Sequence, residues 1–209
     1  MPADEGNSAH RGHVCSPLIL QSQYSLTNPL DFEQMFERNA PVHVDLGCGE
    51  GSFLYAMAQR LPDKNFLGIE RLAGRVRSAA RKTADLDNVR VLHMESAYAV
   101  RYMLPAGSVE TFYLLFPDPW PKRRHHRRRV VTADFLNALD AALAKDGVIY
   151  IATDHADYFR SIKQIASSVG AFVTADVDAD MPSSKFATVF QQQGAPIHRL
   201  ALRKVSAVK

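Results

Sequence analysis

The sequence predicts an α/β protein in which helices cover both faces of a mostly parallel β-sheet. Short apolar segments alternate along the chain with segments whose apolar residues recur at helical spacing. This alternation is typical of a parallel sheet, because each crossover between parallel strands is usually a helix. The predicted strands are residues 42–46, 65–70, 88–93, 109–116 and 148–152, and the predicted helices are residues 52–61, 73–84, 97–104, 132–144 and 158–169.

The 209 residues are predicted to form one domain that follows an N-terminal extension. Residues 1–16 are small, polar and aperiodic, so the extension, residues 1–40, is expected to be partly disordered. Residues 17–28 are expected to run extended over the surface. Residues 41–209 are expected to form a single domain, since the sequence shows neither an internal repeat nor a second domain.

Local patterns support each element of the first half. Residues 30–38 carry apolar side chains near helical spacing, which predicts a short helix. Residues 42–46 and 65–70 are short and mainly apolar, as in strands buried on both faces. The helix at residues 52–61 has its large apolar side chains on one face, whereas the helix at residues 73–84 is basic.

The second half is predicted from caps and strand patterns. Thr132 is a predicted N-cap of the helix that it precedes, and Gly147 is expected just past the end of that helix. The strand at residues 148–152 follows. Residues 171–177 and 198–203 are expected to close the sheet as an antiparallel pair, with a loop region between them.

One stretch, residues 109–130, joins a buried strand to an acid, an aromatic side chain and a run of cations. Three prolines after the strand hold Asp118 and Trp120, the only tryptophan, in a stiff loop. Residues 122–129 then carry six Lys or Arg and no acid, and without them the net charge of +3 would be −3. Charged loops that serve solubility usually mix both signs, so this run is better explained as an electrostatic footprint for a polyanion. The tryptophan either stacks on a base or packs on the fold.

A glycine loop after the first strand of the domain is the second candidate site. Gly47, Gly49 and Gly51 permit a tight turn that presents backbone N–H groups and a helix N-terminus to a ligand. Glu70 ends the next strand roughly twenty residues later, where a carboxylate can accept both hydroxyl groups of a ribose. The loop and this acid together predict a nucleoside-containing cofactor.

The spacing favours S-adenosyl-L-methionine over a dinucleotide. The third glycine falls one residue early for the GxGxxG pattern of dinucleotide binders. S-adenosyl-L-methionine has no pyrophosphate, and its sulfonium is cationic, so acids beside it are favourable. Asp45, directly before the loop, and Glu95, at the end of the third strand, fit this preference. Each of the acids also has a purely structural explanation, as a turn cap or as a surface strand end.

Several other functions are disfavoured by composition. The two cysteines, Cys15 and Cys48, have no CxxC or Cys/His ligand spacing, so no metal is expected. Neither a signal peptide nor a bilayer-spanning apolar run is visible, and the basic run lacks the apolar face of a membrane-surface helix. We expect a cytoplasmic protein with no membrane association. The sequence leaves monomer and homodimer open.

Four segments carry a resemblance to a known family: DLGCGEG, NFLGIE, FPDPWPKRRHHRRRVV and the later ATD. From about Pro41 to its C-terminus, the chain resembles the bacterial tRNA (guanine-N7-)-methyltransferases. The FPDPWPK segment with its basic extension is the specific signature; the glycine loop alone would not be. The resemblance implies a Rossmann-like class I methyltransferase fold and S-adenosyl-L-methionine as the cofactor. It also implies methylation of N7 of the variable-loop guanine, position 46 in tRNA.

The resemblance also implies a role for each residue that matches the family's motifs. The catalytic acid matches Asp118, and the substrate contacts match Lys122, Asp154, Ser184 and Lys185. The cofactor contacts match Asp45, Gly47, Gly49, Gly51, Glu70, Glu95 and Asp118. The RNA-interacting stretch matches Arg124, His125, His126, Arg127, Arg128 and Arg129, with Arg128 as the best single match. The family's Thr-Lys-Phe-Glu motif aligns with residues 184–187, where this chain has Ala187 in place of the glutamate.

Three other functions stay open at this point. The first is a methyltransferase that acts on another RNA or on a protein. The second is a tRNA-binding protein with weakened catalysis, which Ala187 suggests. The third is a nicotinamide-dependent dehydrogenase, which the glycine spacing disfavours.

Overall fold

The computed structural model describes residues 18–19, 28–178, 181–182, 187–188, 192 and 194–205. The predicted disorder of residues 1–16 lies outside the described residues. So do Ser184 and Lys185, two of the expected substrate contacts.

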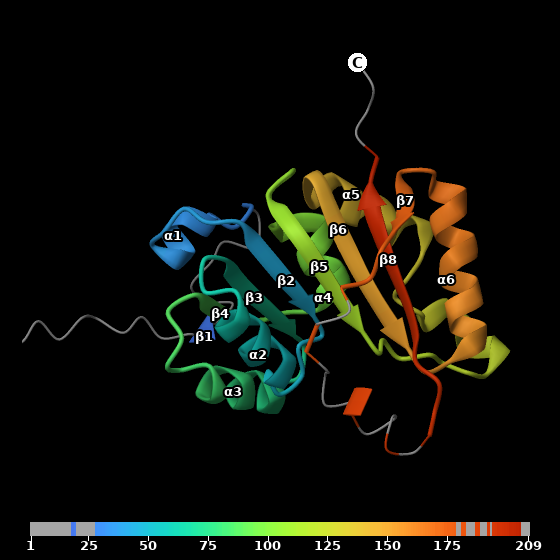
Figure 1. Ribbon diagram of the computed structural model, residues 1–209, viewed down its shortest axis with the longest axis horizontal. Helices are drawn as coiled ribbons and strands as arrows, with labels where there is room; N and C mark the ends of the chain where they lie inside the picture. The colour runs from blue at the N-terminus through green and yellow to red at the C-terminus, as the bar shows by residue number, and fades with distance from the viewer. Residues whose placement is uncertain are drawn as a thin grey trace, which may run out of the picture.

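The described residues form one sheet of eight strands in the order β1-β4-β3-β2-β5-β6-β8-β7 (Figure 1). The strands are β1 (Leu18–Ile19), β2 (Val42–Leu46), β3 (Asn65–Glu70), β4 (Val89–His93), β5 (Val109–Leu115), β6 (Leu143–Thr153), β7 (Phe172–Ala175) and β8 (His198–Lys204). Neighbouring strands from β1 to β6 pair in parallel, and β8 is antiparallel to both β6 and β7. The predicted parallel sheet with an antiparallel C-terminal strand is confirmed.

Helices cover both faces of the sheet, as predicted. The α-helices are α1 (Phe32–Phe36), α2 (Ser52–Arg60), α3 (Ala73–Lys82), α4 (Ser96–Tyr98), α5 (Ala133–Ala142) and α6 (Ala156–Val169); η2 (Ala99–Met103) is π-helical and η3 (Arg123–Arg128) is a 3₁₀-helix. Side chains of α2 and α3 pack on one face of the sheet. Side chains of α1, η2, α5 and α6 pack on the other.

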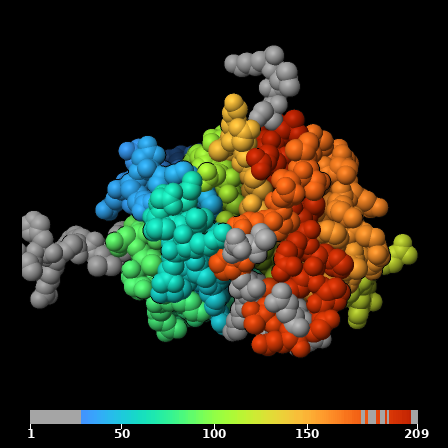
Figure 2. Space-filling view, in the orientation of Figure 1, coloured from blue at the N-terminus to red at the C-terminus, as the bar shows by residue number. Residues whose placement is uncertain are grey.

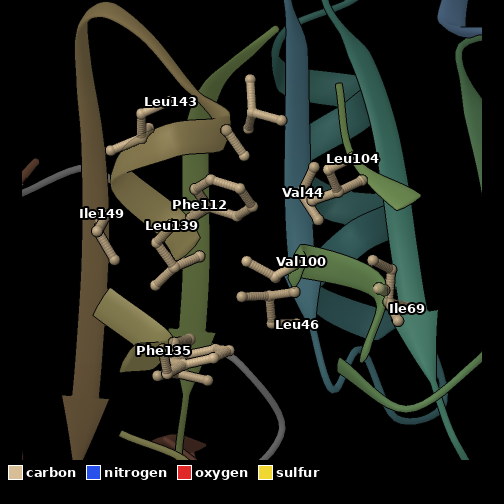
Figure 3. Close-up of a cluster of buried hydrophobic side chains, with 14 of the residues drawn as sticks. Val44, Leu46, Ile69, Val100, Leu104, Phe112, Phe135, Leu139, Leu143 and Ile149 are labelled. Atoms are coloured by element: carbon tan, nitrogen blue, oxygen red, sulfur yellow. The ribbon is translucent and has the colours of Figure 1, made fainter. Parts of the chain in front are cut away.

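The larger core lies between the sheet and the second group of helices. Val44 of β2 and Phe112 of β5 point toward Val100 of η2 and Leu139 of α5 (Figure 3), and all four side chains are at most 3 % exposed. Burying a side chain of this kind contributes roughly 1.5–3 kcal/mol. The apolar side chains of the strands are therefore the main stabilising feature of the fold. The strands end where this apolar pattern stops, and these ends lie at one edge of the sheet.

The direction of the strand order reverses between β2 and β5. From β2 the chain adds β3 and β4 on one side, then returns to add β5 and β6 on the other. In open α/β sheets a ligand binds at the carboxyl ends of the strands beside such a reversal, because the crossovers leave a crevice there. Asp45 of β2 pairs with Tyr113 of β5 across it.

Two predictions about helices are wrong: where one helix ends and whether another is continuous. Gly147 does not follow the end of α5 but lies inside β6, which already begins at Leu143. Leu143 is fully buried opposite Val109, and the pairing resumes at Val148 opposite Thr111, so the intervening residues bulge outward. The helix expected over residues 97–104 is divided into α4 and the π-helical η2.

Candidate functional site

The glycine loop leaves β2 in a conformation that side chains disfavour. Gly47, Gly49 and Gly51 have φ of 79°, 58° and 78°. The backbone N–H groups of Gly47 and Cys48 both donate to the carbonyl of Ile69 in β3, at 2.8 and 3.1 Å. A Cβ added at Gly47 or Gly49 would meet no atom within 4 Å. The first half of the loop is thus an open backbone cradle at the carboxyl edge of the sheet.

Glu70, at the end of β3, is bonded to this loop. One carboxylate oxygen accepts from the N–H of Gly49 at 3.1 Å, and the other accepts from the N–H of Leu72 at 2.8 Å. Each oxygen keeps a further lone pair, because a carboxylate accepts up to about four hydrogen bonds. The acid is therefore held in one orientation beside the cradle.

Asp45 is the most perturbed acid of the site. It is 4 % exposed. Burial, and then the nearby Glu70 carboxylate, raise the pKa of Asp45 to about 7. A cation placed beside these two acids would offset both effects, so this part of the site is suited to a positively charged ligand.

Glu95 follows β4 and has a local structural role. Its two oxygens accept from the backbone N–H groups of Ala97 and Tyr98, at 3.0 and 2.8 Å, and cap the start of α4. Its side chain is exposed at the same edge as Glu70.

The proline-rich loop after β5 brings Asp118 to this edge. The N–H of Phe116 donates to the carbonyl of Ala152 in β6 at 2.7 Å, which ties the start of the loop to the next strand. Phe116 and Trp120 have φ of 55° and 43°, a region that costs residues other than glycine roughly 1–3 kcal/mol. Asp118 lies between these two strained positions and is exposed.

The basic run forms η3, a helix that was not predicted from the sequence. Lys122, Arg123, Arg124, Arg127 and Arg128 are exposed. The guanidinium of Arg128 lies 4.9 Å from the centroid of the Trp120 ring, and His125 meets that ring edge-on at 5.8 Å. The tryptophan therefore packs against the basic helix in this structure.

Arg129 differs from the rest of the run because it is buried, at 8 % exposure. Its Nε donates to the carbonyl of Pro119 at 2.8 Å, and its guanidinium lies 4.6 Å from the centroid of the Tyr158 ring. Sequence reasoning grouped it with the exposed arginines, since a uniform run of cations carries no signal that one of them turns inward.

Asp154 reaches the same edge from β6 and is half-buried. The preceding Thr153 accepts a hydrogen bond from the N–H of His155 at 3.2 Å, and His155 caps α6. The expected acids thus lie at or just beyond the carboxyl ends of five neighbouring strands, β4, β3, β2, β5 and β6, at one edge of the sheet.

A pocket of about 430 Å³ lies beside this edge, on the face that α2 and α3 partly cover. The ends of β5 and β6, the start of β8 and described parts of residues 177–187 line it, and Phe116, Ala152 and Ala187 are among its walls. Arg60 of α2 pairs with Asp178 at 2.9 Å, and orange residues after β7 adjoin the cyan residues of α2 (Figure 2). Ala187, where the family motif has glutamate, is therefore buried and forms part of the pocket wall. The sequence did not predict this location.

No group of three His, Cys, Asp or Glu side chains suited to a metal ion occurs among the residues that the structure describes. Burial raises the pKa of the Cys48 thiol well above its usual value, so this cysteine is kept in its neutral form. Within the same residues, no helix has the length and apolar character needed to cross a bilayer.

Comparisons with known proteins agree on one enzyme class. A family model described as "Putative methyltransferase" matches residues 39–200. Curated relatives named tRNA (guanine-N(7)-)-methyltransferase include one from Aliivibrio salmonicida, 37% identical over 82% of this chain and 73% of the relative. Another, from Leifsonia xyli subsp. xyli, is 38% identical over 79% of this chain and 75% of the relative. A third, from Thermotoga maritima, is 34% identical over 85% of this chain but only 58% of the relative.

Solved structures resemble the fold at low sequence identity. The 16S rRNA methyltransferase KamB has a TM-score of 0.60 at 15% identity, covering 83% of this chain and 91% of that one. An antibiotic-related methyltransferase has a TM-score of 0.58 at 19% identity, covering 86% of this chain and 98% of that one. These likenesses concern the fold alone.

Proposed function

The chain belongs to the tRNA (guanine-N(7)-)-methyltransferase family, and we propose that it transfers a methyl group from S-adenosyl-L-methionine to N7 of a guanine in tRNA. The observation that carries this proposal is the carboxyl edge of the sheet, where the glycine cradle and buried acids adjoin Asp118 and the exposed basic helix. The resemblance of the sequence motifs further points to the variable-loop guanine at position 46. A tRNA substrate also suggests a cytoplasmic location.

The residues on the β2 side of the strand reversal fit the cofactor. The open backbone cradle at Gly47 and Gly49 gives room for a ligand, and Glu70 has free acceptor capacity for ribose hydroxyl groups. Asp45 is an acid whose raised pKa a cationic ligand would lower again. Glu95 lies at the next strand end, where it would flank the adenine.

The reaction requires that the guanine be aligned with the methyl group and that the positive charge on the methylated purine be stabilised. When bound, S-adenosyl-L-methionine supplies an activated methyl group on a sulfonium. Guanine N7 carries a lone pair and no proton, so the chain need not supply a base at that atom. It must hold the guanine in line with the methyl group. The methylated purine is cationic, and the Asp118 carboxylate would stabilise this charge as it develops.

A second acid would fix the orientation of the guanine. Its N1–H and its exocyclic amine are donors, and a carboxylate accepts from both. Asp118 and Asp154 follow the neighbouring strands β5 and β6, so one can take this role while the other faces the developing charge. The pocket beside them has a volume within the usual range for small ligands, and its apolar walls at Phe116 and Ala187 suit a planar base.

The exposed face of η3 would bind the tRNA backbone. Lys122, Arg124, Arg127 and Arg128 present cations without an intervening acid. Contacts of this kind place an RNA in register but carry no sequence information. The choice of the target base is therefore left to the pocket and its acids.

The proposal is tested by incubating the protein with unmodified tRNA and methyl-labelled cofactor, followed by mapping of the modified base. The expected product is a single 7-methylguanine in the variable loop. Ribosomal RNA and bulk protein serve as parallel acceptors. Label found only in these acceptors, or at another tRNA position, would contradict the assigned substrate.

A further inference from the structure

We propose that Arg129 is a positioning residue that fixes the loop carrying Asp118, and that it is not one of the cations that bind RNA phosphates. This inference rests on the proposed tRNA methyltransferase function. It separates one arginine from a basic run that the sequence treats as uniform.

Burial is the first observation. Arg129 is 8 % exposed, whereas Arg124, Arg127 and Arg128 are exposed. Its Nη2 atom is inaccessible to solvent and has no hydrogen-bond partner among the described residues. A phosphate of the tRNA backbone binds from solvent, so it cannot reach this guanidinium while the loop keeps its conformation.

The contacts of Arg129 join three separate segments. Its backbone N–H donates to the carbonyl of His126 at 3.0 Å and ends η3, and its Nε donates to the carbonyl of Pro119, next to Asp118. The guanidinium packs on the ring of Tyr158 in α6, which is fully buried. The hydroxyl of Tyr158 accepts in turn from the N–H of Val131 at 3.2 Å. Arg129 thus connects the proline-rich loop to the core.

Asp118 lies close enough to be affected by this arrangement. Burial raises the pKa of Tyr158, the Arg129 cation opposes this rise, and the Asp118 carboxylate adds to it. Both charges therefore act on the same phenol, one from the loop and one from the end of the basic run.

The loop needs such an anchor for two reasons. Proline lacks a backbone N–H, so residues 117, 119 and 121 cannot donate to a neighbouring segment. Phe116 and Trp120 hold strained conformations that persist only where the surroundings enforce them. A hydrogen bond from a charged donor to the Pro119 carbonyl is of the stronger kind.

The cost of burying this cation supports the same conclusion. Among the described residues, no carboxylate forms an ion pair with Arg129. A buried charge without a paired acid is unfavourable unless another role retains it. The geometry assigns that role to holding the backbone at Pro119, directly after Asp118.

The experiment compares Arg129→Met with Arg127→Met, which removes one exposed cation from the preceding helix η3. In Arg129→Met we expect kcat at saturating tRNA to fall at least tenfold. The slope of log tRNA affinity against log salt should stay as in the wild type. In Arg127→Met we expect the slope to flatten by about one unit, because each phosphate contact contributes roughly 0.9.

Arg129→Lys provides an independent comparison in case the methionine variant folds poorly, which melting and cofactor binding would show. Lysine keeps the positive charge. If Arg129 bound a tRNA phosphate, the lysine variant should therefore bind tRNA and turn over nearly as the wild type does. A positioning role predicts a kcat at least threefold below wild type, since one ammonium cannot both bond the Pro119 carbonyl and lie flat on Tyr158. An unchanged kcat in Arg129→Lys, or a flattened salt slope with normal kcat in Arg129→Met, would overturn the inference. If the wild type itself transfers no methyl group to tRNA, the proposed function fails instead.

Discussion

Asp118 is the residue on which the proposed chemistry depends most. It is exposed at the end of a strained loop, three residues beyond the end of β5. We expect Asp118→Ala to reduce methyl transfer at saturating tRNA by about a hundredfold or more, a typical loss when one charge-stabilising group is removed. Cofactor affinity, measured by calorimetry, should change by no more than a few-fold.

Asp118→Asn is the matched variant, because it keeps the shape of the side chain and removes only its charge. If the charge is what matters, this variant should be nearly as slow as Asp118→Ala. Near-normal turnover in both variants would exclude Asp118 as the catalytic acid.

Asp45 gives the site a pH dependence whose sign can be worked out. Its pKa is about 7 in the folded protein and 3.8 in its ordinary state, so folding favours the protonated form. The contribution of this group to the free energy of unfolding is therefore fully present below pH 3.8 and is lost as the pH rises through 7.

Binding of the cationic cofactor should reverse this preference. The ionised form of Asp45 suits the cationic cofactor. Cofactor affinity should therefore rise by up to tenfold per pH unit up to about pH 7 and level off above that pH. Calorimetry in buffers of different ionisation enthalpy should detect proton release near pH 7. The Asp45→Asn variant should bind more weakly and lose this pH dependence, whereas an unaltered pH profile in that variant would assign the titration to another group.

At the scale of elements, the contact between the glycine loop and α3 is the most sensitive to substitution. A Cβ at Gly51 would lie 2.8 Å from the Cβ of Ala79, and the φ of 78° already disfavours a side chain. We expect Gly51→Ala to lower the free energy of unfolding by about 2 kcal/mol or more, measured by urea denaturation.

Gly74→Ala provides the control within the same helix. Its Cβ would meet no atom within 4 Å, and its φ is not positive. Alanine should stabilise α3 by roughly 0.5–1 kcal/mol, because it reduces the entropy of the unfolded chain. Equal effects of the two substitutions would show that close packing at the loop is not what requires glycine at position 51.

The sequence predicted most elements because their determinants are local. The apolar runs of β2, β3 and β4 end where the pattern ends, and Thr132 caps α5 through a hydrogen bond to the N–H of Phe135 at 3.1 Å. The prediction for Gly147 was wrong. A glycine after a helix usually marks the helix end, but here the pairing of Leu143 opposite Val109 starts β6 before Gly147 is reached. That pairing joins residues that are distant in sequence, so no local pattern reports it.

At the scale of the whole molecule, the basic helix should dominate the salt dependence of tRNA binding. The sequence counts six cations in residues 122–129, but the structure exposes five of them. We expect the double variant Arg124→Gln/Arg127→Gln to flatten the slope of log affinity against log salt by about two units. Methyl transfer at saturating tRNA should stay within a few-fold of wild type. An unchanged slope would show that these arginines do not contact phosphates.

The sequence by itself determined the fold class, the glycine loop after β2 and the signature segment with Asp118. These features depend on apolar periodicity, on glycine and proline and on short motifs, all of which act over a few residues. Only the tertiary structure decided that Arg129 turns inward onto Tyr158, that Ala187 becomes the wall of a pocket, and that β8 enters between β6 and β7. These outcomes depend on which distant segments pack together. The free energy of that packing cannot be inferred from any single stretch of the sequence.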